Sequence, residues 1–166
     1  MQALHEQYGP KESWIQMWEQ KQTPWNMVEA SLGLQKLENE KRIPNGKILI
    51  PGCGQGLDVF YLTNENRSVV GLDLYPKIIE ENNKKRDEKG LKPEHCDFVS
   101  GDFFEFKGEY NVIFDYTFLC ALDPSYRTQW ADQMQKLLVP GGMLITLMFP
   151  LDDHEGGPPF ALSIEM

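Results

Sequence analysis

KILIPGCGQG, residues 47–56, joins a short apolar run to a loop that contains three glycines. The run is brief, rich in β-branched residues and followed by glycine, which indicates a strand buried inside a parallel sheet. Apolar side chains then recur at helical spacing over residues 57–61. The stretch therefore predicts a strand, a tight loop and a helix. Glycine lets a backbone turn sharply and approach a ligand closely, so the candidate ligand-binding positions are Gly52, Gly54 and Gly56.

The same alternation of strand and helix continues along the chain. Further strands are predicted at residues 68–74, 95–102, 110–116 and 143–149, and further helices at 76–90 and 123–138. Asp123 is expected as the N-cap of the last helix with Pro124 as its first residue, and VPGG at 139–142 predicts a turn. The link at 103–109 is long enough only for a turn or a stunted helix. Such alternation predicts a doubly wound α/β fold, a parallel sheet with helices on both faces.

The chain has 166 residues, a length that predicts a single domain over residues 1–166. Residues 46–150 are interpreted as the α/β core and residues 151–166 as a shortened C-terminal segment. Residues 1–45 are interpreted as a helical arm laid on that core. The apolar residues that recur in the arm at helical intervals are Met27, Ala30, Leu34 and Leu37.

Charge and composition exclude several classes of function. The net charge of −9 leaves no basic surface for nucleic-acid phosphates, and the basic residues at 84–86 are interleaved with acidic ones, as on a solvated helix face. No stretch approaches the roughly 18 apolar residues of a membrane-spanning helix, so no membrane contact is predicted. Three cysteines without paired spacing indicate a reducing, cytoplasmic compartment. The three histidines lack metal-ligand spacing, so no metal is expected; they are His5, His95 and His154.

Ligands of an open α/β sheet bind beyond the carboxyl ends of its strands, where the glycine loop is expected to lie. A nucleoside-triphosphate loop is excluded because Leu57 follows the last glycine. The spacing G-x-G-x-G is tighter than that of a dinucleotide loop and is typical of S-adenosylmethionine enzymes. Asp73 ends the second predicted strand, where a carboxylate accepts ribose hydroxyls, although a helix-capping role is the alternative. Asp102 and Phe103 follow the third strand and suit an adenine base.

SWIQMWEQKQTPW, residues 13–25, contains three of the four tryptophans of the chain. Trp14 and Trp18 are four positions apart and share one side of a helix. The plain interpretation is a helix that docks its apolar face on the core. The sharper hypothesis is a lid, because indole faces attract cations and the sulfur of S-adenosylmethionine is a permanent cation.

Seven motifs spread over residues 14–160 resemble those of one family. They are WIQMWEQKQTPW, PGCGQGLDV, VVGLDL, GDFF, FDYTFLCALDP, LITLMFP and HEGGPPF. The chain resembles the halide/thiol S-adenosylmethionine-dependent methyltransferases, within the thiopurine methyltransferase-like group. The resemblance implies a Rossmann-like class I methyltransferase sheet of at least five parallel strands in the order 3-2-1-4-5, with S-adenosyl-L-methionine as cofactor. The generic methyltransferase loop carries an acidic residue where this chain has Ile50.

The resemblance also implies roles for individual residues. It implies cofactor contacts from Trp14, Trp18, Trp25, Gly52, Asp73, Asp102, Phe103 and Tyr116. As a mechanistic hypothesis, Tyr116 at the end of the fourth strand is expected to orient the acceptor or the sulfonium. The residues expected to wall a small acceptor pocket are Phe118, Pro158, Pro159 and Phe160.

The expected reaction is an in-line methyl transfer to a small sulfur or halide nucleophile, namely a thiol, hydrosulfide, thiocyanate or halide ion. Thiolate is already reactive, so no strong base is required, and catalysis is expected from proximity and loss of hydration. Asp115 is either a base or a buried contact to a helix N-terminus. The alternatives are a thiopurine-type enzyme for a bulkier aromatic thiol, a non-catalytic S-adenosylmethionine-binding module and, more distantly, a nicotinamide oxidoreductase.

Proteins of this family continue past the GGPPF motif with a helix and a final pair of strands. The resemblance therefore implies that this pair is missing here and that the strand at 143–149 lies at a sheet edge. A long apolar edge is normally protected, so the chain is expected to be a fragment, a shortened isoform or a protein that pairs this edge with a partner.

Overall fold

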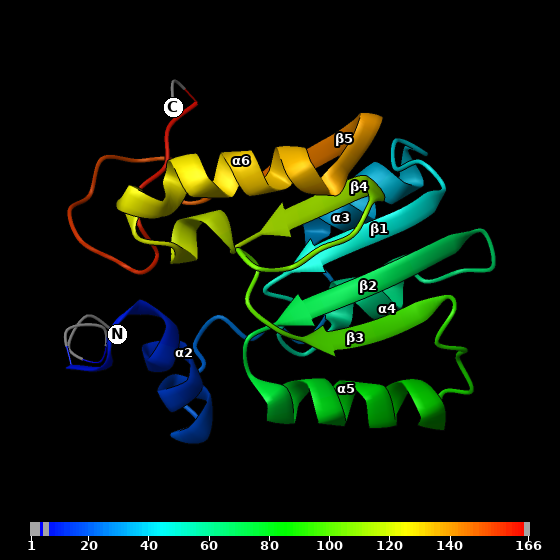
Figure 1. Ribbon diagram of the computed structural model, residues 1–166, viewed down its shortest axis with the longest axis horizontal. Helices are drawn as coiled ribbons and strands as arrows, with labels where there is room; N and C mark the ends of the chain where they lie inside the picture. The colour runs from blue at the N-terminus through cyan, green and yellow to red at the C-terminus, as the bar shows by residue number, and fades with distance from the viewer. Residues whose placement is uncertain (1–3, 5–6, 165–166) are drawn as a thin grey trace.

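The computed structural model describes residue 4 and residues 7–164 of the chain. Within them lies a five-stranded sheet in the order β3-β2-β1-β4-β5, and every neighbouring pair of strands is parallel (Figure 1). This order confirms the predicted doubly wound sheet. The strands are β1 (Gly46–Pro51), β2 (Arg67–Asp73), β3 (Cys96–Ser100), β4 (Tyr110–Tyr116) and β5 (Leu138–Leu147).

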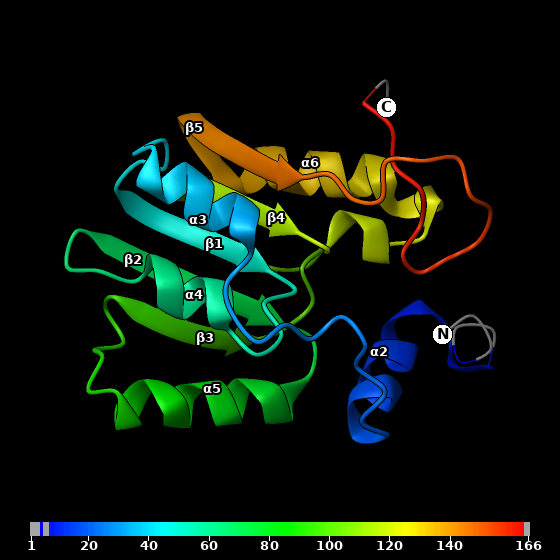
Figure 2. The ribbon, with the colours of Figure 1, turned by 180° about the vertical axis from the view of Figure 1, so that it is seen from behind.

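Helices cover both faces of this sheet. Along β1 the side chains of Ile48 and Ile50 enter one apolar cluster and that of Leu49 enters the other, as the two-residue period of a strand requires. The first cluster also receives side chains from three helices, two of which lie in front of the sheet in Figure 2. These helices are α3 (Leu32–Asn39), α4 (Leu57–Leu62) and α5 (Pro76–Glu88). The second cluster is covered by α6 (Arg127–Leu137).

Helix α2 (Pro10–Glu19) packs Ile15 and Trp18 against the first cluster but does not lie along a face of the sheet. It lies beyond the arrowheads of the strands in both Figure 1 and Figure 2, at the carboxyl end of the sheet. The arm therefore reaches the edge at which open α/β sheets bind ligands.

The helix predicted around Met27 and Leu34 is shorter than the spacing of its apolar residues suggests. Residues 26–31 are not helical, and α3 begins after Ser31, whose hydroxyl accepts a hydrogen bond from the backbone N–H of Leu34. The backbone N–H of Ser31 donates in turn to the carboxylate of Asp58, at 2.8 Å. This N-cap fixes the start of α3, because Ser31 has the non-helical backbone angles of an N-cap residue (φ −57°, ψ 135°).

The predicted N-cap at Asp123 is present, but it caps a shorter element. Its carboxylate accepts a hydrogen bond from the backbone N–H of Ser125 at 2.9 Å, which stabilises the 3₁₀ turn η2 (Pro124–Tyr126). The α-helix itself begins only at Arg127.

The turn predicted at 139–142 lies inside β5 rather than before it. Tyr110 pairs with Leu138 and Val112 pairs with Met143, so five steps along β5 match two steps along β4. Residues 139–142 therefore bulge out of the ladder, and regular pairing resumes at Met143. A bulge of this kind explains how a Pro-Gly-Gly sequence fits within one strand.

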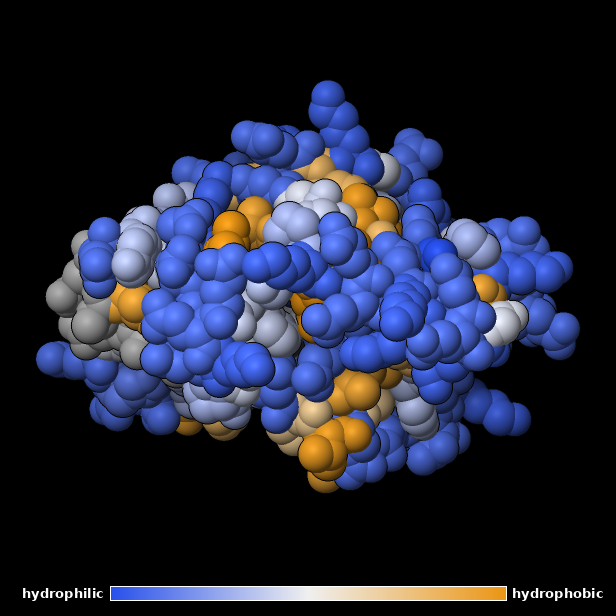
Figure 3. All heavy atoms as spheres, turned by 90° about the horizontal axis from the view of Figure 1, so that it is seen from below, coloured by the Kyte–Doolittle hydropathy of each residue, from blue (hydrophilic) through white to orange (hydrophobic). Residues whose placement is uncertain are grey.

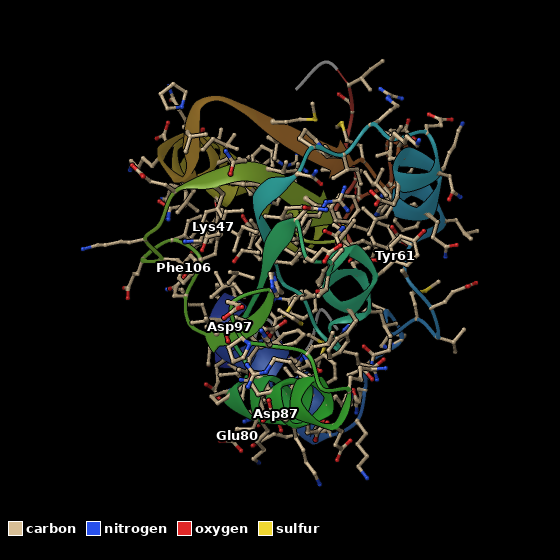
Figure 4. The ribbon with its side chains drawn as sticks, turned by 90° about the vertical axis from the view of Figure 1, so that its right-hand side faces the viewer. Lys47, Tyr61, Glu80, Asp87, Asp97 and Phe106 are labelled. Carbon is tan, nitrogen blue, oxygen red and sulfur yellow. The ribbon has the colours of Figure 1, made fainter. Side chains whose placement is uncertain are left out.

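The basic run at 84–86 is only partly the solvated face that was predicted. Hydrophilic side chains dominate the surface seen in Figure 3, on the side where α5 lies, and Lys84 is exposed. Arg86, however, is only 11% exposed and donates to the carboxylate of Asp97 at 3.1 Å. Asp97 extends from β3 above α5, whereas Glu80 and Asp87 lie on α5 itself (Figure 4). Arg86 therefore joins α5 to the sheet.

Candidate functional site

A largely apolar cavity of about 500 Å³ lies at the carboxyl ends of the strands. Its other walls come from α2 and from the segments that follow β4 and β5. Gly56 and Phe160 are not on its surface, in contrast to their predicted roles. The predicted residues that do line it are Trp14, Trp18, Trp25, Gly52, Gly54, Asp73, Asp102, Phe103, Tyr116, Phe118, Pro158 and Pro159.

The two predicted residues outside the cavity have structural roles. Gly56 takes the left-handed conformation (φ 74°) as the N-cap of α4, and a Cβ there would lie 2.5 Å from the ring of Phe98. The Phe160 ring packs directly against Gly157, and its backbone N–H donates to the carbonyl of Cys120 at 2.7 Å. Phe160 therefore ties the C-terminal segment to the turn after β4 instead of facing the cavity.

The glycine loop approaches the cavity closely at Gly52. This residue has φ 62°, a conformation costly for any side chain, and an added Cβ would lie 2.6 Å from the ring of Phe118. Gly54 follows on the cavity surface, where its backbone N–H donates to a carboxylate oxygen of Asp73 at 2.9 Å. The loop is therefore held against the end of β2 by the acidic residue predicted from the sequence.

Asp73 combines burial with hydrogen-bonding capacity. Its second carboxylate oxygen accepts from the backbone N–H of Tyr75 at 3.1 Å. Burial raises the pKa of this carboxyl above its ordinary value, whereas the hydrogen bonds from Tyr75 and Gly54 oppose that rise. Each carboxylate oxygen has two lone pairs, so both oxygens keep acceptor capacity for a ligand hydroxyl in the cavity.

Asp102 stands at the end of β3, on the same side of the sheet. One oxygen accepts from the backbone N–H of Phe104 at 3.0 Å, and the other pairs with the ammonium of Lys11 on α2. Phe103 follows Asp102, is 5% exposed and meets the ring of Phe118 edge to face, with centroids 5.0 Å apart. A carboxylate and an aromatic surface thus occur together, as predicted for a base-binding position.

The three N-terminal tryptophans form one cluster. The centroid of Trp25 lies 5.1 Å from that of Trp14 and 6.0 Å from that of Trp18, and both pairs meet edge to face. Trp18 also stacks on Tyr75, with centroids 5.9 Å apart and planes 12° from parallel. Since Tyr75 follows the end of β2, the cluster is fixed at the cavity mouth beside Asp73.

Tyr116, the last residue of β4, and the residues after it form one wall of the cavity. Tyr116 and Thr117 both line the cavity, and Thr117 has φ 61°, which is rare for a β-branched residue. Strained conformations of this kind gather at functional sites. The Thr117 hydroxyl donates to the carbonyl of Tyr116 at 2.6 Å, which stabilises the turn.

Asp115 supports that wall from within the protein. It is 1% exposed, does not line the cavity, and accepts hydrogen bonds from the backbone N–H of Leu119 (3.1 Å) and the indole N–H of Trp130 (2.9 Å). Burial raises its pKa to about 6. Leu119 begins the 3₁₀ turn η1 (Leu119–Ala121), so Asp115 is the helix-terminus contact and not a base that reaches the cavity.

Several residues of the site escaped the sequence reasoning. Lys11 and Tyr75 contact the predicted residues from distant parts of the chain, and Tyr126 and Phe149 line the cavity. The position of Tyr75, directly after the strand that ends at Asp73, could have predicted that it lies at the site. Lys11 carried no such signal, since its partner is 91 positions away.

The fold is the Rossmann-like sheet of class I S-adenosylmethionine-dependent methyltransferases. The chain resembles the structure of TehB from Haemophilus influenzae with a TM-score of 0.65 at 21% identity, covering 84% of this chain and 48% of that one. It resembles magnesium protoporphyrin IX methyltransferase from Synechocystis PCC 6803, solved with S-adenosylhomocysteine, with a TM-score of 0.62 at 14% identity, covering 78% of this chain and 68% of that one. At such identities the likeness establishes the fold.

The chain belongs to the thiopurine S-methyltransferase family, which matches residues 10–166. "Probable thiol methyltransferase 2" of Arabidopsis thaliana is 42% identical over 153 residues, covering 91% of this chain and 67% of that protein. "Thiocyanate methyltransferase 1" of the same plant is 39% identical over 153 residues, with the same coverage. The chain thus spans about two thirds of the length of these relatives. Family and fold confirm the resemblance and fit methyl transfer to a sulfur nucleophile.

Two further properties concern the described residues alone. Among them, no helix is both long and apolar enough to cross a membrane. Nor do three or more histidine, cysteine or acidic side chains come together there as ligands for a metal ion. His5, one of the three histidines considered above, lies outside the described residues.

Proposed function

We propose that this chain binds S-adenosyl-L-methionine in the cavity and transfers its methyl group to a small sulfur nucleophile, a thiol or thiocyanate, with halide ions as further acceptors. One observation carries the proposal. Three indole rings and two strand-end carboxylates, separated by up to 88 positions in the sequence between Trp14 and Asp102, surround one cavity. A helix that merely docked its apolar face would have no reason to bring its tryptophans to the ligand-binding edge of the sheet.

The residues present fit the adenosine part of this cofactor. Asp73 keeps acceptor capacity for ribose hydroxyls while its bonds to Gly54 and Tyr75 hold it in place. Asp102 and Phe103 offer an acceptor and an aromatic surface one strand away. Gly52 and Gly54 bring bare backbone to the same surface. These features are the donor and acceptor set that an adenosine requires, and they leave the indole cluster for the methionine end.

The indole cluster suits a permanent cation. Each aromatic face attracts a cation by about 0.5–2 kcal/mol, more where water is excluded, and carries no nucleophile that a methyl donor would alkylate. When bound, the cofactor supplies an electrophilic methyl group on a sulfonium. Trp14, Trp18 and Trp25 would hold that charge and shield it from water, so we assign α2 and residues 20–25 the role of a lid. In this proposal residues 1–45 act with residues 46–166 as one domain.

The acceptor would enter beside Tyr116 and Phe118. The described residues record no hydrogen-bond partner for the Tyr116 hydroxyl, and that residue lines the cavity, so it is available to orient the nucleophile. Phe118, Pro158 and Pro159 provide apolar walls that strip water from a small anion. Thiols with a pKa near 8.5 supply thiolate without a strong base, consistent with the occupied carboxylate of Asp115.

A bulkier aromatic thiol is the second candidate acceptor. The rings of Phe104 and Tyr126 lie 5.6 Å apart on the cavity surface, which suits a flat aromatic substrate. "Thiopurine S-methyltransferase" of Nitrosospira multiformis is 28% identical to this chain over 172 residues, covering 92% of this chain and 77% of that protein.

Methyl transfer from S-adenosylmethionine to thiocyanate, hydrosulfide, iodide and thiophenol, followed in parallel, tests the proposal and separates these acceptors. We expect turnover with the small sulfur nucleophiles and weaker turnover with iodide. Turnover of thiophenol alone would favour the second candidate. Heat of cofactor binding without turnover of any acceptor would indicate a binding module, and absence of cofactor binding would refute the proposal.

We further infer that the outer edge of β5, which no other strand of residues 7–164 covers, pairs with β5 of a second copy. The strand carries no charged residue from Leu138 to Leu147, whereas exposed edges usually carry charges that prevent pairing. Met143 and Leu144 are 41% and 37% exposed. Sedimentation velocity should detect a dimer that Leu144→Lys abolishes, and a wild-type monomer at all concentrations would contradict the inference.

Three unpaired cysteines support a cytoplasmic location; they are Cys53, Cys96 and Cys120.

A further inference from the structure

Two charged residues of α2 lie at the ends of the helix where the macrodipole disfavours their charge. Lys11 stands in its first turn and Glu19 at its last residue, and no basic residue occupies the last turn. The N-terminus of a helix carries a positive partial charge and the C-terminus a negative one, so both placements oppose the macrodipole. Glu12, in the same turn, has the charge that the helix N-terminus favours. The positions of Lys11 and Glu19 are therefore better explained by partners outside the helix.

Both residues have such partners, on two different elements of the α/β core. Lys11 pairs with the carboxylate of Asp102 after β3, and this contact raises the pKa of the lysine. Glu19 accepts a hydrogen bond from the ammonium of Lys77, in the first turn of α5, at 3.0 Å. The Lys77 ammonium also lies 5.9 Å from the centre of the Tyr75 ring. Each end of α2 is thus tied to the core by one ion pair of opposite polarity.

Apolar contacts also dock α2, because Ile15 and Trp18 pack against the first apolar cluster. Only Ser13 and Met17 are buried within its ten residues, and Trp18 adds the stack on Tyr75. An isolated helix shorter than about 12–15 residues is marginal in water, so α2 stays helical only while it is docked. Breaking the ion pairs should therefore increase the fraction of time for which α2 is undocked and unfolded.

We propose that Lys11–Asp102 and Glu19–Lys77 are two ionic latches that hold α2 closed over the cavity. This inference rests on the proposed function for its consequence, since a closed lid retains the cofactor. The Lys11 latch uses an oxygen of Asp102, the same carboxylate proposed to meet adenine, so cofactor entry must share or displace it. The Glu19 latch lies outside the cavity surface, which makes Glu19 and Lys77 positioning residues that touch no ligand.

Hydrogen exchange of the α2 amides, measured by mass spectrometry on the full chain without ligand, tests the Glu19–Lys77 latch by substitution and both latches by their dependence on salt. Glu19→Lys and Lys77→Glu should each speed exchange over residues 12–20 by roughly two- to fivefold, the range expected for an exposed ion pair. The double variant Glu19→Lys/Lys77→Glu restores the pair with reversed polarity and should return exchange to the wild-type rate. Salt at about 1 M shortens the screening length to about 3 Å and should bring the wild type toward the single variants.

Lys107→Glu is the matched control, because Lys107 is exposed and the described residues record no ion pair for it. It should leave exchange over α2 unchanged. Amides of β1 report whether each variant retains its sheet, so a folding defect is recognised separately. Single variants that exchange like the control, or a double variant as fast as the single ones, would overturn the latches.

Dissociation of S-adenosylhomocysteine, followed by tryptophan fluorescence in a stopped-flow instrument, connects the latches to the ligand. The single variants should release the ligand two- to fivefold faster than the wild type, and the double variant should not. A wild type that binds no S-adenosylhomocysteine would refute the proposed function, while the exchange experiment would still decide on the latches. Normal binding with identical release rates in all variants would refute the role of the latches in retention.

Discussion

Asp73→Asn is the substitution whose outcome the structure specifies most fully. The carboxylate accepts from the backbone N–H groups of Gly54 (2.9 Å) and Tyr75 (3.1 Å). The asparagine side chain keeps one accepting oxygen but places its NH₂ group against the second backbone N–H. One partly buried donor is then left unsatisfied, which costs about 1–3 kcal/mol. For a chain of this length the free protein should melt about 2–12 °C lower.

The same substitution should weaken cofactor binding if Asp73 holds the ribose. Loss of one hydrogen bond to a charged acceptor is worth about 1.5–3 kcal/mol, or roughly a ten- to hundredfold loss of affinity. Calorimetric titration with S-adenosylhomocysteine measures this loss. The 2′-deoxy analogue of the same ligand provides the control for distortion of the loop, because it lacks one of the hydroxyls.

The two ligands and two proteins form a thermodynamic cycle. We expect Asp73→Asn to cost the analogue markedly less affinity than the parent ligand. An equal cost for both ligands would refute direct contact between Asp73 and the ribose and would leave the residue with a loop-positioning role only.

Two further substitutions test the walls of the cavity. Gly52→Ala should lower both stability and ligand affinity, because its φ of 62° and the ring of Phe118 at 2.6 Å each oppose a Cβ. Gly90→Ala is the control, because Gly90 also has a positive φ (67°) but a Cβ there would meet no atom within 4 Å. In a melting experiment it should show only the backbone cost of about 1 kcal/mol. Burial raises the pKa of Asp115 to about 6, so ionisation of this carboxyl disfavours the folded state. The free energy of unfolding of the wild type, relative to that of Asp115→Asn, should therefore fall by up to about 3 kcal/mol as pH rises from 4 to 6. A difference that stays constant over this pH range would contradict the assignment.

Much of the sheet could be predicted because local patterns determine it. The apolar run before Gly52 and the strand that ends at Asp73 follow from length, β-branching and the residues at their ends, and parallel strands bring such ends to one edge. The site residues contributed by that edge were therefore accessible to sequence reasoning. The extent of α3 was not, because the cap at Ser31 and its bond to Asp58 outweigh the helical spacing of Met27.

Contacts between distant segments could not be predicted from the chain alone. Lys11 meets Asp102 only once α2 crosses the end of β3, and Arg86 leaves the solvated face of α5 only because Asp97 lies beside it. Phe160 was expected to wall the acceptor pocket, yet its position is set by a backbone bond to Cys120. In each case the partner is determined by tertiary packing and leaves no local pattern.

The central claim is that indole rings at the mouth of the sheet hold a positively charged sulfur. Titration of the wild type and Trp25→Ala with S-adenosylmethionine and with S-adenosylhomocysteine, whose sulfur is neutral, tests it most directly. Loss of one cation–π contact of about 0.5–2 kcal/mol should weaken the charged ligand roughly two- to thirtyfold more than the neutral one. An equal loss of affinity for the two ligands, or no loss for either, would contradict the account.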